Sequence, residues 1–169
     1  MDAHLILEAC EIIGALTPLA GDCGALCGAA CCQPDEDGQG GMLLFPGEAE
    51  MYRGEKGFTL VDSPHGTILV CEGRCSRANR PLACRMFPLV MLLRPDGVKI
   101  ATDAAAQSVC PLARQGKSAL SQDFVAAVRQ AANLLAQDDQ QAAHLRRLTD
   151  MQDELKALRA QYRGRKEHV

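Results

Sequence analysis

The chain has 169 residues, a formal net charge of −3 and a pI near 5.8, so its overall charge does not favour binding to nucleic acid. Hydrophobic residues make up 47% of the sequence but aromatic residues only 4%, which predicts a folded domain with little of the buried area that large rings supply. No stretch approaches the roughly 20 apolar residues needed to cross a bilayer, so we do not expect a membrane partner. For the reason of charge given above, we do not expect a nucleic-acid partner either.

Residues 3–16 place leucine and isoleucine side chains three and four positions apart, which predicts an N-terminal amphipathic helix. Asp2, Glu8 and Glu11 interrupt its apolar residues, whereas a secretory signal has an unbroken apolar run. We therefore expect a cytoplasmic protein, in a compartment that keeps thiols reduced.

The middle of the chain has the pattern of short strands separated by turns. Apolar and β-branched runs predict strands at residues 42–45, 67–70, 89–93 and 98–101. Residues 33–41 are polar and rich in glycine, which predicts a surface loop, and residues 94–97 predict the turn between the last two strands. Pro46, followed closely by acidic residues, predicts the start of a helix.

From Ser118 onward the pattern changes to that of helices. Ser121 followed by Asp123 predicts the start of one helix, and a second apolar stripe runs from Leu145 to Tyr162. This stripe either covers the protein's own core, which the shortness of the run favours, or forms the seam of a coiled-coil dimer.

Together these elements predict an α+β fold built around a small cysteine-rich domain with short strands. The predicted organisation is an N-terminal helix at residues 1–19, the cysteine-rich domain at residues 20–115 and a segment of two helices at residues 116–169. We expect the central domain to contain the functional site, because eight of the chain's cysteines lie within it.

Cysteine accounts for 9 of the 169 residues, far above ordinary usage. Cys10 lies near the apolar face of the first predicted helix, and we expect it to pack as a small hydrophobic residue. The other eight form the candidate ligand set: Cys23, Cys27, Cys31, Cys32, Cys71, Cys75, Cys84 and Cys110. In a reducing compartment, clustered thiols favour metal ligation over disulfides. The four histidines are scattered, so we predict an all-sulfur site for zinc or an iron–sulfur cluster.

The first cysteine block leaves its local structure open. In a helix, Cys23, Cys27 and Cys31 would share one face, because four residues make just over one turn. The glycines between them weaken a helix, so a loop is an equal alternative. The adjacent Cys31 and Cys32 point in different directions in either structure, and we expect them not to bind the same mononuclear metal. A nucleophilic cysteine would need a base and an orienting group, and the sequence identifies neither.

The second cysteine block is Cys71-Glu72-Gly73-Arg74-Cys75, and a longer motif follows it, Arg80-Pro81-Leu82-Ala83-Cys84-Arg85-Met86-Phe87-Pro88. With the earlier Cys-Cys pair, this motif resembles the YkgJ-like cysteine-cluster family, described as zinc- or iron-chelating. That family shows Gly-x-Cys followed by Arg-Pro-x-x-Cys-Arg-x-Phe-Pro. The resemblance spans about residues 20–115, and the first block differs by having three residues in each gap where family members commonly have two. The resemblance implies metal binding, without an established activity.

The same pattern occurs in flagellin lysine N-methylases, which are considerably longer proteins. The resemblance therefore also implies an alternative function, a metal-dependent enzyme related to protein lysine N-methylation. Arg80 and Arg85 are candidate cofactor-binding residues, because an arginine beside thiolates can offset their charge or hold an anionic substrate. An ordinary salt bridge to a nearby acid is the competing interpretation.

A third possibility is a metal-stabilised protein-interaction module. Under this interpretation the C-terminal helices would contact a protein partner through the stripe from Leu145 to Tyr162. The metal would then serve folding rather than catalysis.

Overall fold

The structure is a computed structural model that describes residues 3–21, 23–33, 40–72 and 75–166, the last four as main chain only. Within these ranges the α-helices are α1 (His4–Ile13), α2 (Leu82–Met86), α3 (Pro111–Gln115), α4 (Gln122–Leu135) and α5 (Asp139–Lys166). The strands are β1 (Met42–Leu43), β2 (Phe58–Ser63), β3 (Gly66–Cys71), β4 (Leu89–Arg94) and β5 (Gly97–Thr102). The predicted α+β class is confirmed.

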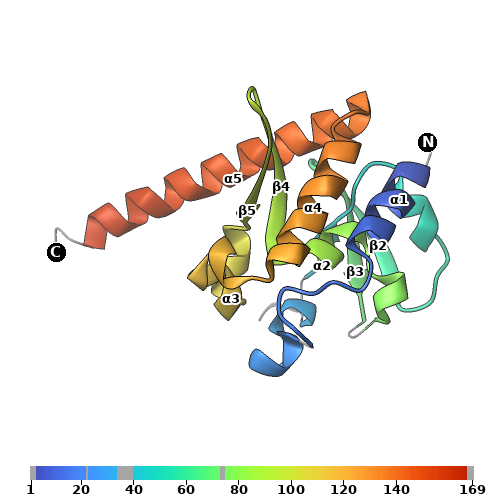
Figure 1. Cartoon of the computed structure of the whole chain (residues 1–169), viewed down its shortest axis with the longest axis horizontal. Coiled ribbons are helices and arrows are strands. Elements are labelled where there is room, and N and C mark those ends of the chain that lie inside the picture. The colour runs from blue at the N-terminus through green and yellow to red at the C-terminus, as the bar shows by residue number, and fades with distance from the viewer. Residues whose placement is uncertain (1–2, 22, 34–39, 73–74, 167–169) are drawn as a thin grey trace.

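The β4–β5 hairpin lies at the centre of the molecule (Figure 1). Its strands are antiparallel, and Arg94 pairs with Gly97 across the predicted turn. The four residues from Leu89 to Leu92 are all buried. Because successive side chains in a strand point to opposite sides, β4 must be covered on both sides. Helix α4 packs against both strands of the hairpin, and α5 runs along β4.

Helix α5 also closes the edge of this small sheet. The Thr149 hydroxyl accepts the N–H of Leu93 at 3.0 Å and donates to the carbonyl of Leu93 at 3.4 Å. Further along, the Gln152 side chain accepts the N–H of Ala104 at 2.8 Å. An open strand edge leaves main-chain groups unpaired, so these contacts give α5 a polar attachment in addition to its apolar one.

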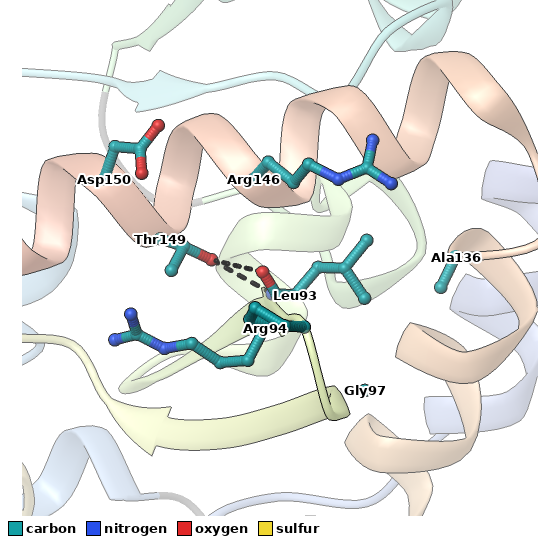
Figure 2. A pocket seen from close by; sticks show the side chains of 8 residues that line it. Leu93, Arg94, Gly97, Ala136, Arg146, Thr149 and Asp150 are labelled. Atoms are coloured by element: carbon teal, nitrogen blue, oxygen red, sulfur yellow. Dashed lines mark hydrogen bonds between the residues drawn. The ribbon is translucent and has the colours of Figure 1, made fainter.

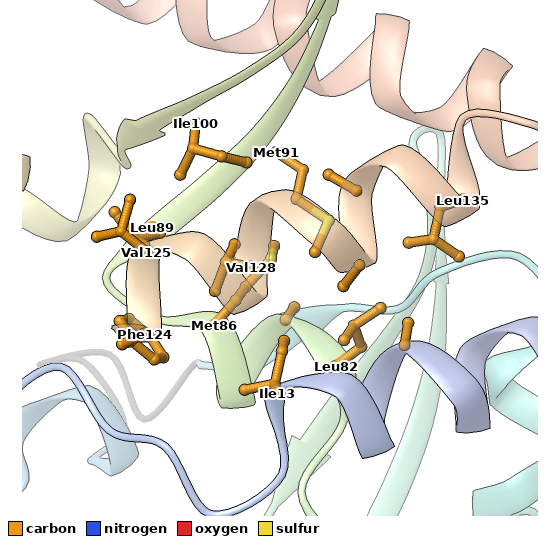
Figure 3. Close-up of a cluster of buried hydrophobic side chains, with 14 of the residues drawn as sticks. Ile13, Leu82, Met86, Leu89, Met91, Ile100, Phe124, Val125, Val128 and Leu135 are labelled. Carbon is orange, nitrogen blue, oxygen red and sulfur yellow. The ribbon is translucent and has the colours of Figure 1, made fainter. Parts of the chain in front are cut away.

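The main hydrophobic core joins α1, α2 and α4 to the hairpin. Figure 3 shows side chains from these elements in one cluster, including Ile13, Leu82, Met86, Leu89, Met91, Ile100, Phe124, Val128 and Leu135. Helix α4 begins as predicted, because the Ser121 hydroxyl accepts the N–H of Phe124. The core draws side chains from the N-terminal helix, the cysteine-rich region and the C-terminal helices alike.

A second, three-stranded antiparallel sheet has the order β1-β3-β2. A small cluster of Leu44, Tyr52 and Leu69 packs beside it. The predicted strand at 67–70 is confirmed within β3, whereas the one at 42–45 is paired only at residues 42–43. The helix predicted from Pro46 is a 3-10 helix, η3 (Glu48–Tyr52). In the predicted loop at 33–41, residues 34–39 lie outside the described part of the chain.

The apolar stripe of α5 divides into a buried and an exposed part. Leu145 is fully buried and Leu148 packs against the main core, which confirms that the first part of the stripe covers the protein's own core. Leu158 is 52% exposed and Tyr162 66% exposed, where the helix runs past the body of the protein (Figure 1). Among the described residues, no helix combines the length and the apolar character required to cross a lipid bilayer.

The two ends of the stripe should respond differently to the same truncation. Leu145→Ala should lower the free energy of unfolding by about 2–5 kcal/mol, because it leaves a cavity in the core. Leu158→Ala should change it by less than about 0.5 kcal/mol, as exposed positions usually do. Urea denaturation of both variants measures this difference. If both variants lost the same free energy of unfolding, the exposed end of α5 would have to be buried by a second molecule in solution.

Candidate metal centre

The first cysteine block lies in the chain that follows α1, in two short turns rather than one helix. Helix η1 (Cys23–Leu26) and helix η2 (Ala30–Cys32) are both 3-10 helices. Ala29 stands between them with φ 57°, a left-handed conformation that a continuous right-handed helix excludes. The sequence left open whether this block forms one helix or a loop, and the structure has no continuous helix here.

The two cysteines of the second block, Cys71 and Cys75, and the following Cys84 lie in three different structural contexts. Cys71 is the last residue of β3 and pairs with Phe58 of β2. Cys75 follows the sheet, and the intervening residues 73–74 lie outside the described part of the chain. Cys84 sits in the middle of the five-residue helix α2. All three side chains are partly accessible to solvent.

Seven of the eight candidate ligands interact electrostatically. The pKa of Cys84 is raised, first by burial and then by the charges of Cys75, Cys32 and Cys71. The pKa of Cys31 is raised to about 12, first by burial, then by the charge of Cys32 and by a hydrogen bond with it. Charges from the other cysteines of the first block add to this rise. The charge of Cys32 thus acts on both Cys84 and Cys31.

Cys110 and Cys10 have a different environment, the main hydrophobic core. Each is 7% exposed. Cys110 precedes α3, and its N–H donates to the carbonyl of Ala106 at 2.8 Å. The expectation that Cys10 packs as a small hydrophobic residue is confirmed.

The thiols do not form a ready-made coordination site. Among the described residues, no three Cys, His, Asp or Glu side chains lie close enough together to hold a metal ion. None of the nine cysteines, all of which are described, forms a disulfide. The donor set is nonetheless all sulfur, which suits zinc and iron–sulfur centres.

The arginines beside the cysteines bind main-chain carbonyls. Arg85 donates to the carbonyl of Arg80 at 3.0 Å and to that of Ala78 at 2.8 Å. Its observed hydrogen bonds therefore brace the segment between Cys75 and Cys84. Arg80, the other candidate, lies within this segment and is half-buried.

Arg77 is a site residue that the sequence did not identify. Its guanidinium donates to the carbonyl of Gly14 at 3.2 Å and to that of Leu16, which ties the second block to the chain leading into the first. Burial lowers the pKa of Arg77, as do the charges of Arg80 and Arg85, while Cys23 raises it. Three arginines thus lie near one another beside the thiols. No pattern marks Arg77 in advance, because its partners are main-chain atoms.

A groove of about 590 Å³ lies elsewhere, between the tip of the β4–β5 hairpin and α5 (Figure 2). Arg94 lines it but forms a two-pronged ion pair with Asp153, with both N–O distances at 2.6 Å. Thr149 also lines it and is engaged with Leu93. The groove contains no cysteine, and two of its polar side chains already serve the fold.

Comparison with known proteins adds no assignment for these residues. The chain matches no protein-family model, no curated protein and no solved structure. What the cysteines bind is therefore inferred from their chemistry and their placement.

The buried Cys10 provides a test of how tightly α1 is held. Burial raises its pKa from 9.0 to about 11, so at pH 8 the folded, reduced protein should be alkylated there about 100-fold more slowly than the unfolded chain. Iodoacetamide labelling followed by peptide mass spectrometry, with and without urea, measures this ratio. Equal rates would show that α1 leaves the core readily.

Proposed function

We propose that this protein binds zinc or an iron–sulfur cluster through its cysteines. Cys32, Cys71, Cys75 and Cys84 would form one four-thiolate site, beside a second group of Cys23, Cys27 and Cys31. The supporting observation is the electrostatic interaction of Cys84 with Cys75, Cys32 and Cys71, which come from separate parts of the chain. This grouping assigns the adjacent Cys31 and Cys32 to different groups.

The chemistry of the thiols favours a cation. Thiols that lie close together raise one another's pKa, because each thiolate repels the next. A bound metal cation removes this repulsion, since it takes the place of the protons and is attracted by every thiolate. Four thiolates complete a closed zinc site or hold a cluster. Arg77 and Arg85 would supply positive charge beside such a site.

The resemblance to the YkgJ-like family supports the same proposal through Arg80-Pro81, Cys84-Arg85 and Phe87-Pro88. Adjacent cysteines and the pattern shared with lysine N-methylases favour iron over zinc. A cytoplasmic location would keep the thiols reduced and available. Catalysis related to lysine N-methylation is supported by the sequence pattern alone.

A second candidate function is a protein-interaction module. It is favoured by the exposed Leu158 and Tyr162 on the end of α5 that extends past the body (Figure 1). Metal binding and partner binding are compatible, because these residues lie on a different element from the cysteines.

Elemental analysis tests metal binding directly. Protein purified without oxygen or chelator should contain stoichiometric zinc or iron. Cys84→Ser should retain less than about a tenth of that content after dialysis, because removal of one ligand opens the site. Cys10→Ser makes the same atomic change in the core and should retain all of it. Visible charge-transfer absorption would identify an iron–sulfur cluster, and a colourless zinc protein would decide for zinc. Absence of both metals from the wild type would refute the proposal.

Removal of the metal should loosen only part of the molecule. Hydrogen exchange should become faster around Cys71 and in α2, because metal–thiolate bonds would add to the stability of the segments that carry the ligands. Exchange in α4 should stay slow, since its buried residues belong to the apolar core. Unchanged protection around Cys71 and α2 after complete metal loss would contradict a structural role for the metal.

A further inference from the structure

The helix η3 carries a fully buried carboxylate, that of Glu48, which is 0% exposed. One of its oxygens accepts the N–H of Leu82 at 2.6 Å, and the other accepts the N–H of Phe45 at 3.0 Å. A buried carboxylate is costly unless hydrogen bonds replace its water. Both oxygens of Glu48 are used in this way, so the side chain is held in one orientation.

The bond to Leu82 fixes the start of α2. Leu82 is the first residue of this five-residue helix, and Cys84 is its third. The first N–H groups of a helix have no partner within it, and the residue before α2, Pro81, provides no side-chain cap. Glu48 therefore supplies from a distant part of the sequence the acceptor that α2 lacks.

Tyr52, at the other end of η3, holds the chain just before α2. It is 5% exposed, and its hydroxyl donates to the carbonyl of Asn79 at 3.2 Å. Its ring packs edge-on against Phe58, with ring centroids 5.1 Å apart, which fixes the direction of the hydroxyl. Glu48 and Tyr52 thus bind the two ends of the segment from Asn79 to Leu82.

Both residues interact electrostatically with Cys84. Burial raises the pKa of Glu48 to about 7, while its two backbone hydrogen bonds and the charge of Arg85 lower it. Burial also raises the pKa of Tyr52, and the charges of Glu48, Cys10 and Cys84 add to that rise. Arg85 braces the same segment from α2, through the carbonyls of Ala78 and Arg80.

We propose that Glu48 and Tyr52 are positioning residues, which hold α2 so that Cys84 faces the other thiols of the metal site. The inference rests on the proposed metal binding, because positioning matters for function only if Cys84 is a ligand. Groups behind the ligands commonly orient them, and their loss typically lowers metal affinity about 10- to 100-fold.

Two variants remove the contacts with little change in shape. Glu48→Gln keeps the size of the side chain, but its amide nitrogen would face one of the two backbone N–H groups instead of an acceptor. Tyr52→Phe removes only the hydroxyl and keeps the ring against Phe58. Glu50→Gln on the same helix is the matched control for charge, because Glu50 is exposed and pairs only with the exposed Arg53. Tyr162→Phe, at a residue that is 66% exposed, is the control for the hydroxyl.

Metal affinity, measured by competition with a chelator of known strength for zinc and for ferrous iron, is the first readout. Glu48→Gln should lower it about 10- to 100-fold. Tyr52→Phe should lower it about threefold to tenfold, the effect of one hydrogen bond. The two controls should leave it unchanged. Wild-type affinity in both Glu48→Gln and Tyr52→Phe would overturn the assignment.

The alkylation rate of Cys84 in the reduced, metal-free protein is the second readout, and it does not depend on metal. It should rise in both variants, because α2 is no longer held at its start. If the wild type binds no metal but this rise is seen, the proposed function fails and the positioning role stands. If the wild type binds metal and Cys84 reacts alike in all variants, the positioning role fails alone.

Hydrogen exchange in α4 separates local positioning from general stability. Protection there should be kept in both variants, because the buried side chains of α4 belong to the main apolar core, whereas Tyr52 of η3 belongs to the separate cluster with Leu44 and Leu69. Loss of α4 protection in Glu48→Gln and Tyr52→Phe alike would show that η3 supports the whole fold, and would overturn a role specific to the site.

Discussion

Removal of β4 from water is the constraint on which the rest of the fold depends. The residues from Leu89 to Leu92 are buried in succession, and alternate side chains point to opposite sides, so a single packing partner could not cover them. Helix α4 packs against the hairpin, α5 runs along β4 and bonds its edge through Thr149, and α1 and α2 complete the core (Figure 3). The same core holds α2 through its buried Leu82, Ala83 and Met86, and α2 carries Cys84.

Polar contacts with the main chain also hold the cysteine segments. Arg77 binds carbonyls in the chain after α1, Arg85 binds those before α2, and Glu48 binds the first N–H of α2. Such contacts set distances and directions more narrowly than apolar packing does, because hydrogen bonds weaken steeply as their angle departs from linear. Burial raises the pKa of Cys84 and of Cys31, and the charges of neighbouring cysteines add to both rises, so a cation is the simplest partner that removes this repulsion.

Sequence reasoning succeeded wherever a signal was local. The spacing of apolar residues in α1, the turn before Gly97 and the Ser121 cap each lie within a few residues, and all three are present. Helices α2 and α3 were missed, because five residues are too few to show a helical period. Strand β2 was also missed, since half of its residues are exposed and the other half only partly buried, so its apolar residues do not stand out. The predicted helix after Pro46 is the 3-10 helix η3, whose role comes from contacts distant in the chain.

The sequence by itself determined the chemistry available to this protein, namely nine thiols, scattered histidines and apolar stripes of the right period. Only the tertiary structure decided which thiols interact: the charge of Cys32 acts on both Cys84 and Cys31, whereas Cys110 lies in the hydrophobic core. It also decided that Glu48, Tyr52 and Arg77 hold the cysteine segments. The physical reason is that these side chains bind main-chain N–H and carbonyl groups. Nearly every residue carries those groups, so no pattern of residue types in the sequence can predict which of them a given side chain will bind.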